Sequence, residues 1–169
     1  SSGNDYSLYF ARGALLEGQA IADHLRDRHP RVLQVYRDDR RGRTLAAAFR
    51  ERLATENMQD VAVEPGHRLT PEFWMSLFSR RTQSTLVVWL EAADLQSLVL
   101  PGGRDSGACE AYLSYTQSGE PGLQSSWRRN ACLAYPFQLP DVPAPEASRL
   151  RGWLQSRRVV SPHEKIQFN

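Results

Sequence analysis

Lysine, cysteine and long hydrophobic segments are scarce in this sequence. Its 169 residues carry 21 basic side chains against 19 acidic ones, and Lys165 is the single lysine among arginines. Such a balanced charge gives no global field that would attract nucleic acid or an anionic membrane. The longest apolar runs, such as residues 85–90, are too short to cross a bilayer. We therefore expect a chain that works in water and binds no nucleic acid.

Motifs that would identify an enzyme are missing as well. The sequence has no Gly-x-Gly-x-x-Gly after a strand and no Gly-x-x-x-x-Gly-Lys-[Ser/Thr], so no nucleotide-binding loop is expected. Residues 103–107 place a serine between glycines, but in a loop rather than at the strand-to-helix turn of a nucleophile elbow. The four histidines are scattered and match no metal-binding spacing. We expect no catalytic activity, no cofactor and no metal site.

Two cysteines, Cys109 and Cys132, make up the whole thiol content. Their separation and the lack of neighbouring histidines exclude the common zinc-binding patterns. A disulfide is one interpretation, and two free buried cysteines are the other, because free cysteine packs as a small hydrophobe. The spacing alone does not decide between them.

The clearest pattern in the chain is that of a β-α-β unit. Residues 31–36 are a short apolar and β-branched run between polar turns, which is typical of a buried strand. From residue 42 to residue 53, apolar side chains recur at helical spacing opposite arginines. Residues 61–63 then close the unit as a strand parallel to the first. A parallel sheet requires helices on both of its faces, so the same alternation should recur along the chain.

The rest of the sequence continues this alternation. The expected strands are residues 6–10, 31–36, 61–63, 84–90, 111–115 and 132–135, with a loop at 11–13 after the first. The expected helices are residues 14–28, 42–53, 71–78, 92–100, 123–130 and 145–157. This order predicts an α/β fold with three layers, α/β/α, around a mostly parallel sheet. We expect residues 1–5 to be an expression remnant or flexible end, 6–158 a single lobe, and 159–169 a tail that could cross to another lobe.

In such a sheet, ligands bind outside the carboxyl ends of the strands, so site residues should follow the expected strands. Arg12 follows the first strand, and Asp38 follows the second within the cluster RDDRRGR at residues 37–43. Arginines at a strand end beside a helix N-terminus could hold a carboxylate or phosphate. In the alternative interpretation, the aspartates of the cluster neutralise its arginines on a solvated turn.

Several stretches of the chain, in their order, resemble the carboxyl-terminal lobe of type I periplasmic solute-binding proteins, the leucine/isoleucine/valine-binding class. They are YSLYFARG, VLQVYRDDRRGRTLAAAFRERL and STLVVWLEAADLQSLV, and the resemblance covers roughly residues 6–135. It implies one α/β lobe of a two-lobed receptor that clamps an amino acid or similar solute as the lobes close. It also implies a periplasmic or extracellular location, and a membrane transporter permease or other receptor as partner.

The resemblance also adds residues to the candidate site. By match, Arg41 stands where the family has a tyrosine, Glu91-Ala92 form the loop after the fourth strand, and Ser114-Tyr115 belong to the following strand. The arginine argues against branched-chain specificity and leaves a more acidic or bulkier ligand open. The full candidate set is Arg12, Asp38, Arg41, Glu91, Ala92, Ser114 and Tyr115.

One lobe presents half of a cleft, so this chain alone should bind an amino acid, carboxylate or amide weakly or not at all. Two other functions stay open. The first is a protein-interaction module of flavodoxin-like fold, which includes a homodimer formed through the cleft edge or a sheet edge. The second is a small enzyme that uses Asp38, Asp39 and Glu91, with a divalent metal.

Overall fold

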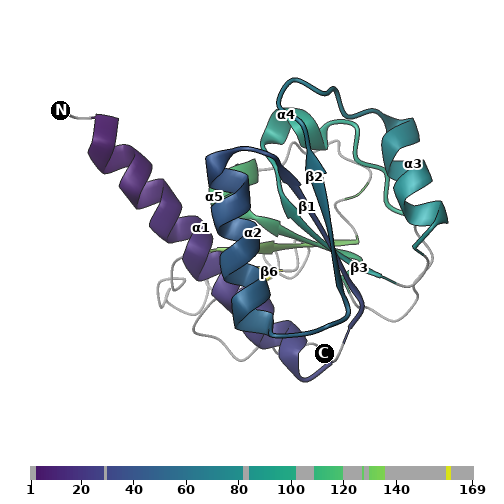
Figure 1. Ribbon diagram of the computed structural model, residues 1–169, viewed down its shortest axis with the longest axis horizontal. Helices are drawn as coiled ribbons and strands as arrows, with labels where there is room; N and C mark the ends of the chain where they lie inside the picture. The colour runs from purple at the N-terminus through teal and green to yellow at the C-terminus, as the bar shows by residue number, and fades with distance from the viewer. Residues whose placement is uncertain are drawn as a thin grey trace, which may run out of the picture.

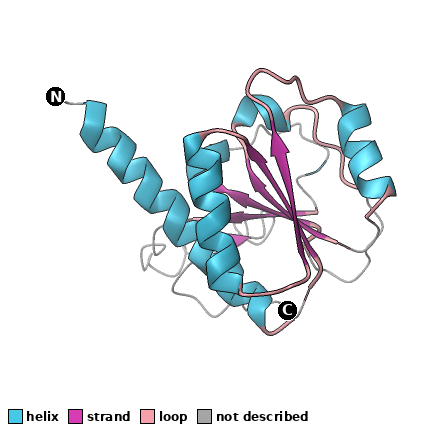
Figure 2. Cartoon of the chain, in the orientation of Figure 1, coloured by secondary structure: helices cyan, strands magenta, loops and turns pink. Residues whose placement is uncertain are grey.

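The computed structural model describes residues 3–28, 30–81, 84–101, 109–119, 127, 130–135 and 159–160, and for 3–11 and 159–160 it describes the backbone only. These residues form a six-stranded sheet in the order β2-β1-β3-β4-β5-β6, and the strand pairings are parallel. Helices cover both faces of the sheet (Figures 1 and 2). The expected three-layer α/β fold is confirmed.

The strands are short and β1 lies between β2 and β3. Their bounds are β1 Val32–Arg37, β2 Met58–Val63, β3 Thr85–Trp89, β4 Ala111–Ser114, β5 Ala131–Ala134 and β6 Val159–Val160. The helices are α1 Gly3–Arg26, α2 Arg40–Leu53, α3 Pro71–Ser79, α4 Ala92–Leu95 and α5 Tyr115–Ser118. In the register, Val35 of β1 is paired with Val61 of β2 and with Val88 of β3.

Alternate residues of each strand point to opposite faces and build two apolar cores. On β1, Val32 belongs to the core beneath α1 and α2, whereas Leu33 belongs to the core beneath α3 and α4. Phe49 of α2 and Trp74 of α3 are fully buried in these two cores. Full burial of a large apolar side chain contributes roughly 2 to 3 kcal/mol. Both faces of the sheet are therefore covered, which explains the nearly continuous apolar runs of the central strands.

The strand predicted at residues 6–10 and the loop predicted at 11–13 are wrong, because both lie inside helix α1. A five-residue run of aromatic and apolar side chains cannot be assigned to strand or helix by periodicity alone. Gly13 is tolerated within the helix at a cost of about 1 kcal/mol. At about 1.5 Å per residue, α1 is about 36 Å long, roughly twice the length of the longest strands. Figure 1 shows its amino-terminal half extending beyond the sheet.

Capping residues define where α2 and α3 begin. Asp39 caps α2 by accepting a hydrogen bond from the Gly42 N–H at 2.7 Å. Thr70 caps α3 by accepting from the Phe73 N–H at 3.4 Å, and Pro71 occupies the first helical position. The predicted start of α3 is confirmed, and α2 begins two residues earlier than expected because Asp39 supplies the cap.

The later part of the chain differs more from expectation. Helix α4 ends at Leu95 rather than at residue 100. Val159–Val160, which was expected in a carboxyl-terminal tail, pairs in parallel with β5 as β6. The helices predicted at 123–130 and 145–157 lie outside the described residues, apart from two residues of the first.

Cys109 and Cys132 form a disulfide, with their Cα atoms 5.6 Å apart. Cys109 lies two residues before β4 and Cys132 lies within β5, so the bond joins the beginnings of two neighbouring strands. Both residues are buried in the core beneath α1 and α2. Of the two interpretations left open by the sequence, the structure has the disulfide.

Gly42, in the first turn of α2, lies against the end of β1. A Cβ added to it would be 2.1 Å from the Arg37 carbonyl oxygen. We expect Gly42→Ala to lower the free energy of unfolding by roughly 2 kcal/mol, although alanine usually favours a helix by about 1 kcal/mol over glycine. Gly66→Ala is the control, because Gly66 has a φ of 83° but open space at its Cβ, and it should cost about 1 kcal/mol. Denaturant titration measures both, and a smaller loss for Gly42→Ala would contradict this account.

Candidate functional site

The candidate site is the edge at which the carboxyl ends of strands β1 to β5 meet. In an open parallel sheet, ligands bind at this edge, near the point where the strand order reverses. The reversal falls between β1 and β3, because the chain from β1 first adds β2 on one side and then β3 on the other. The described residues at this edge belong to the segments 37–39, 64–67, 90–94, 114–119 and 135.

Arg37, the last residue of β1, ties together the segments that follow β2 and β3. Its guanidinium binds the Asp94 carboxylate of α4 through Nε to Oδ2 at 3.1 Å and Nη2 to Oδ1 at 2.5 Å. Its Nη1 donates to the carbonyl oxygens of Glu64 and His67 at 2.9 and 2.7 Å. The hydrogen bond to Asp94 is the main cause that raises the pKa of Arg37 above its ordinary value. This guanidinium supports the edge and has little capacity left for a ligand.

Glu17, on α1, places a fully buried side chain against the start of α5. Its carboxylate accepts hydrogen bonds from the Ser114 hydroxyl, from the Thr116 backbone N–H at 3.0 Å and from the Thr116 hydroxyl at 2.8 Å. Burial raises the pKa of Glu17 from 4.5 to about 7, while the hydrogen bonds from Ser114 and Thr116 act in the opposite direction. An ionisable group therefore joins α1 to α5.

The stability of the fold should depend on pH through Glu17. Because folding raises its pKa, the carboxyl contributes stability that is fully present below pH 4.5 and is lost as the pH rises through about 7. We expect the free energy of unfolding of the wild type, relative to Glu17→Gln, to fall by on the order of 3 kcal/mol across this range. Denaturant titrations at several pH values measure the fall. The exposed Glu51→Gln serves as control, and a wild-type value that stays parallel to that of Glu17→Gln would disprove the coupling.

Arg41 and Gln117 connect the first turn of α2 to α5. With the Gln117 carboxamide in the orientation that satisfies both groups, its oxygen accepts from Arg41 Nε at 2.8 Å and from Nη2 at 3.3 Å. The Gln117 backbone N–H donates to the Ser114 hydroxyl oxygen at 3.2 Å, which caps α5. Arg41 is nevertheless exposed. Its guanidinium is thus held in place while solvent still reaches it.

Tyr115 and Tyr135 stack against each other at the same edge. Their ring centroids lie 4.5 Å apart and their planes are inclined by 27°. Tyr115 is the first residue of α5, after β4, and Tyr135 directly follows β5, so the stack joins the ends of adjacent strands. Both side chains are half-buried. The edge therefore carries an aromatic surface. One of its two rings, Tyr115, lies two residues before Gln117, which binds Arg41.

Three of the seven residues predicted for the site lie around α5. Tyr115 begins this helix, Ser114 caps it, and Arg41 reaches it through Gln117. Ser114 is fully buried and its hydroxyl binds Glu17, so it supports the edge from behind. The structure therefore leaves Arg41 and Tyr115 as the members of this group that a ligand can reach.

The other four predicted residues are not among those that bond Glu17 or Gln117 around α5. Asp38 pairs with Arg43 at 2.7 Å on an exposed turn, as the alternative interpretation of the arginine cluster had it. Glu91 and Ala92 are exposed at the start of α4. Arg12 is exposed on α1 rather than in a loop at a strand end, because residues 11–13 are helical.

The sequence analysis missed Glu17, Thr116 and Gln117. Glu17 carried a signal, since its spacing places it on the same helical stripe as Ala14 and Ile21, both fully buried. A carboxylate on an apolar stripe must find hydrogen-bond donors. Thr116 and Gln117 carried no such signal, because their roles depend on contacts with α1 and α2, which are distant in the chain.

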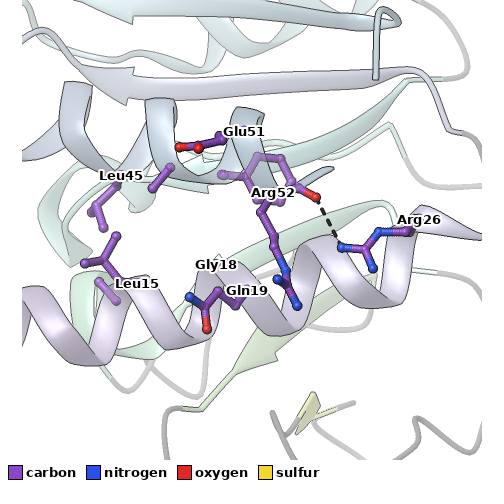
Figure 3. Close-up of a pocket in the computed structure, with 10 residues that line it drawn as sticks. Leu15, Gly18, Gln19, Arg26, Leu45, Glu51 and Arg52 are labelled. Atoms are coloured by element: carbon purple, nitrogen blue, oxygen red, sulfur yellow. Dashed lines mark hydrogen bonds between the residues drawn. The ribbon is translucent and has the colours of Figure 1, made fainter. Parts of the chain in front are cut away.

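A separate groove of about 400 Å³ lies between α1 and α2 (Figure 3). All of its lining residues come from these two helices, with Leu15 and Leu45 toward one end and Arg26 and Arg52 toward the other. Both arginines pair with Asp23, at 2.8 and 3.0 Å. The groove is therefore formed without any residue from the strand ends, and its basic end is already neutralised in part.

Three further findings bear on function. Among the described residues, no group of three or more histidine, cysteine, aspartate or glutamate side chains could hold a metal ion. In the same part of the chain, no helix is long and apolar enough to span a membrane. No protein-family model matches the chain, and no curated protein sequence matches it significantly.

Proposed function

We propose that this chain is one lobe of a receptor for a small solute, and that the carboxyl edge of its sheet faces the ligand. The observation that carries the proposal is the arrangement around α5. An exposed arginine, Arg41, is fixed by Gln117, and the stacked rings of Tyr115 and Tyr135 end at the same edge. A guanidinium and an aromatic surface at one edge of the sheet suit a solute with a carboxylate or amide group, such as an amino acid.

The resemblance to type I periplasmic solute-binding proteins supports this proposal from the sequence side. In a two-lobed receptor, a second lobe would cover the carboxyl edge and supply the opposing contacts. Helix α1 extends beyond that edge, where a second body would have a surface to pack on (Figure 1). We propose that the liganded receptor then contacts a membrane transporter permease or another receptor component.

The disulfide supports a periplasmic or extracellular location. Disulfides persist mainly in oxidising compartments and are rare in reducing ones. The Cys109–Cys132 bond is buried and joins two strands of the core, so it has a structural place in the fold. We therefore propose that the protein folds and works in an oxidising environment.

The carboxylates considered for an enzyme argue against that alternative. Asp38 pairs with Arg43, Asp39 caps α2, and Glu91 stands at the exposed start of α4. Each of the first two is engaged in a local contact, and the three form no acidic cluster that could hold a divalent metal. We propose a binding protein that needs no cofactor.

An interaction module remains the second candidate because of one observation. Leu16 of α1 is 44% exposed, and the helix continues from there beyond the sheet. A homodimer that pairs these helices would cover this surface. Analytical ultracentrifugation distinguishes the two candidates, since a concentration-dependent dimer lost in Leu16→Glu favours the module and a monomer at all concentrations favours the receptor lobe.

Solute binding can be located by nuclear magnetic resonance. We expect amino acids, carboxylates or amides to bind this single lobe with a dissociation constant of about 1 mM or weaker, because half of the cleft contacts are absent. The amide signals of Arg41, Tyr115 and Gln117 should shift on titration. Signals of Gly18 and Leu45, which line the groove between α1 and α2, are the internal control. Of the two expectations from the sequence, weak binding or none, the exposed Arg41 favours weak binding. Shifts confined to the groove, or none with any of these solutes, would therefore refute the proposal.

A further inference from the structure

Among the residues whose side chains the structure describes, two acidic side chains are buried, Glu17 completely and Glu110 nearly so. Its carboxylate receives the Ser114 hydroxyl, the Thr116 hydroxyl and the Thr116 backbone N–H. The donors belong to the end of β4 and the first turn of α5, 97 to 99 residues further along the chain. Glu17 thus links α1 to the end of β4 and to α5, which lie far from α1 in the sequence.

The hydrogen bond from Ser114 has a second consequence for α5. While the Ser114 hydroxyl donates to Glu17, its oxygen accepts from the Gln117 backbone N–H at 3.2 Å. A hydroxyl has one proton to donate and two lone pairs with which to accept. The charged form of Glu17 therefore orients the very group that caps α5, and Gln117 in turn holds Arg41.

Protonation of Glu17 changes this arrangement. A protonated carboxyl becomes a donor at one oxygen, so it competes with the Ser114 hydroxyl for the same position. Ser114 must then turn its proton elsewhere within a fully buried site. Its oxygen then accepts from both the Glu17 carboxyl and the Gln117 N–H, so the hydroxyl must rotate to direct one lone pair at each donor, and the geometry of the α5 cap changes. The three hydrogen bonds that the Glu17 carboxylate accepts from Ser114 and Thr116 therefore cannot all persist once Glu17 is protonated.

We propose that Glu17 is a positioning residue for the solute-facing edge, and that a proton on its carboxyl loosens α5 and thereby displaces Tyr115 and Gln117. The solute-binding part of this inference rests on the proposed function, whereas the movement of α5 does not. Solute affinity should then be higher when Glu17 is ionised. A coupling of this kind usually changes affinity about fivefold or more.

Other titratable and charged groups on the elements around Glu17 have partners elsewhere or lie in solvent. Arg41 of α2 binds Gln117, Tyr115 of α5 stacks on Tyr135, and Cys132 of β5 is in the disulfide. The remaining charged residues of α1 and α2 whose side chains are described are exposed, apart from His24, and they are Arg12, Asp23, Arg26, Arg40, Arg43, Arg50, Glu51 and Arg52.

His24 of α1 and Tyr112 of β4 complete this environment. His24 Nε2 lies 3.0 Å from the Tyr112 hydroxyl. Burial lowers the pKa of His24 to about 4 and raises the pKa of Tyr112 to about 12. Neither His24 nor Tyr112 therefore changes its protonation near pH 7, where Glu17 titrates.

The test is a pH titration of the ligand-free protein from about pH 5 to pH 9, followed by nuclear magnetic resonance of the backbone amides and the side-chain carboxyl of Glu17. We expect the Thr116 and Gln117 amides to move together with the Glu17 carboxyl, with a midpoint near 7. The movement should vanish in Glu17→Gln and persist in Glu51→Gln, whose glutamate is exposed on α2. Amides that stay constant while Glu17 titrates, or a Glu17 carboxyl that titrates at its ordinary pKa, would overturn the proposal.

A second variant keeps the test valid if Glu17→Gln folds poorly. In Ser114→Ala, Glu17 should still titrate, but the Gln117 amide should no longer follow it, because the connecting hydroxyl is gone. A Gln117 response unchanged in this variant would overturn the proposed route.

Repeating the solute titration at both ends of the pH range then separates the two proposals. If the α5 step is present and no solute binds, the inference about Glu17 is upheld and the proposed function fails.

Discussion

Replacing Arg37 with alanine should lower the free energy of unfolding by about 3 kcal/mol. The side chains of Arg37 and Asp94 are each 18% exposed, so the pair is largely shielded from solvent. Removal of the guanidinium leaves the Asp94 carboxylate without its partner and deprives two backbone carbonyls, of Glu64 and His67, of a donor. The loss of a charged partner at a shielded site costs more than the net value of the bond itself.

Arg43→Ala provides a matched control for this prediction. Arg43 also pairs with an aspartate, Asp38, at 2.7 Å, but the two side chains are 63% and 40% exposed. An ion pair so accessible to water contributes less than about 1 kcal/mol. Urea denaturation of both variants should therefore separate them clearly. Equal losses would show that Arg37 does not hold the loops after β2 and β3 in the way described.

The second large effect concerns the disulfide. Replacing both Cys109 and Cys132 with alanine should lower the free energy of unfolding by about 3 kcal/mol, because the bond closes a loop between residues 23 apart and restricts the unfolded chain. The two residues lie toward the beginnings of β4 and β5, and the proposed ligand edge is at the other end of these strands. Stability should fall while the chemical shifts of edge residues in the folded protein change little.

A reducing agent supplies an independent check of the disulfide prediction. Thermal unfolding of the wild type in reductant should approach that of the double-alanine variant, and the variant itself should not respond to reductant. For this check, the wild type is denatured and refolded in reductant so that its buried disulfide is reduced. If its unfolding then matches that of the untreated wild type, the bond contributes no stability. Such a result would also remove the support that the disulfide gives to a location in an oxidising compartment.

Much of the sheet could be predicted from the sequence, because its signals are local. Residues 86–89 form a continuous apolar run within the central strand β3, which is buried on both faces. Thr70 and Pro71 marked the start of α3 by capping alone. The error at residues 6–10 arose because Tyr, Leu and Phe suit a strand as well as a helix, and only the continuation into the packed half of α1 decides between them.

The candidate site was less accessible to sequence reasoning. The rule that ligands bind at the carboxyl ends of strands led to Arg41, Ser114 and Tyr115, and these do gather around α5. Their roles differ, however, because Ser114 is turned toward Glu17 and away from solvent. Contacts between residues about one hundred positions apart, such as that between Glu17 and Thr116, leave no local pattern. The Arg41–Gln117 bridge likewise depends on how α2 and α5 are placed by the sheet.

The most direct test of the receptor proposal compares solute affinity in two arginine variants. Arg41→Ala removes the guanidinium held at the carboxyl edge by Gln117, and Arg80→Ala removes an exposed arginine at the end of α3, with the same change in net charge. For the best solute found in the panel, we expect Arg41→Ala to weaken binding about tenfold, as loss of a charged hydrogen bond should. Arg80→Ala should leave the dissociation constant unchanged. Equal affinities in the wild type and Arg41→Ala, or equal losses in both variants, would contradict a solute site at this edge.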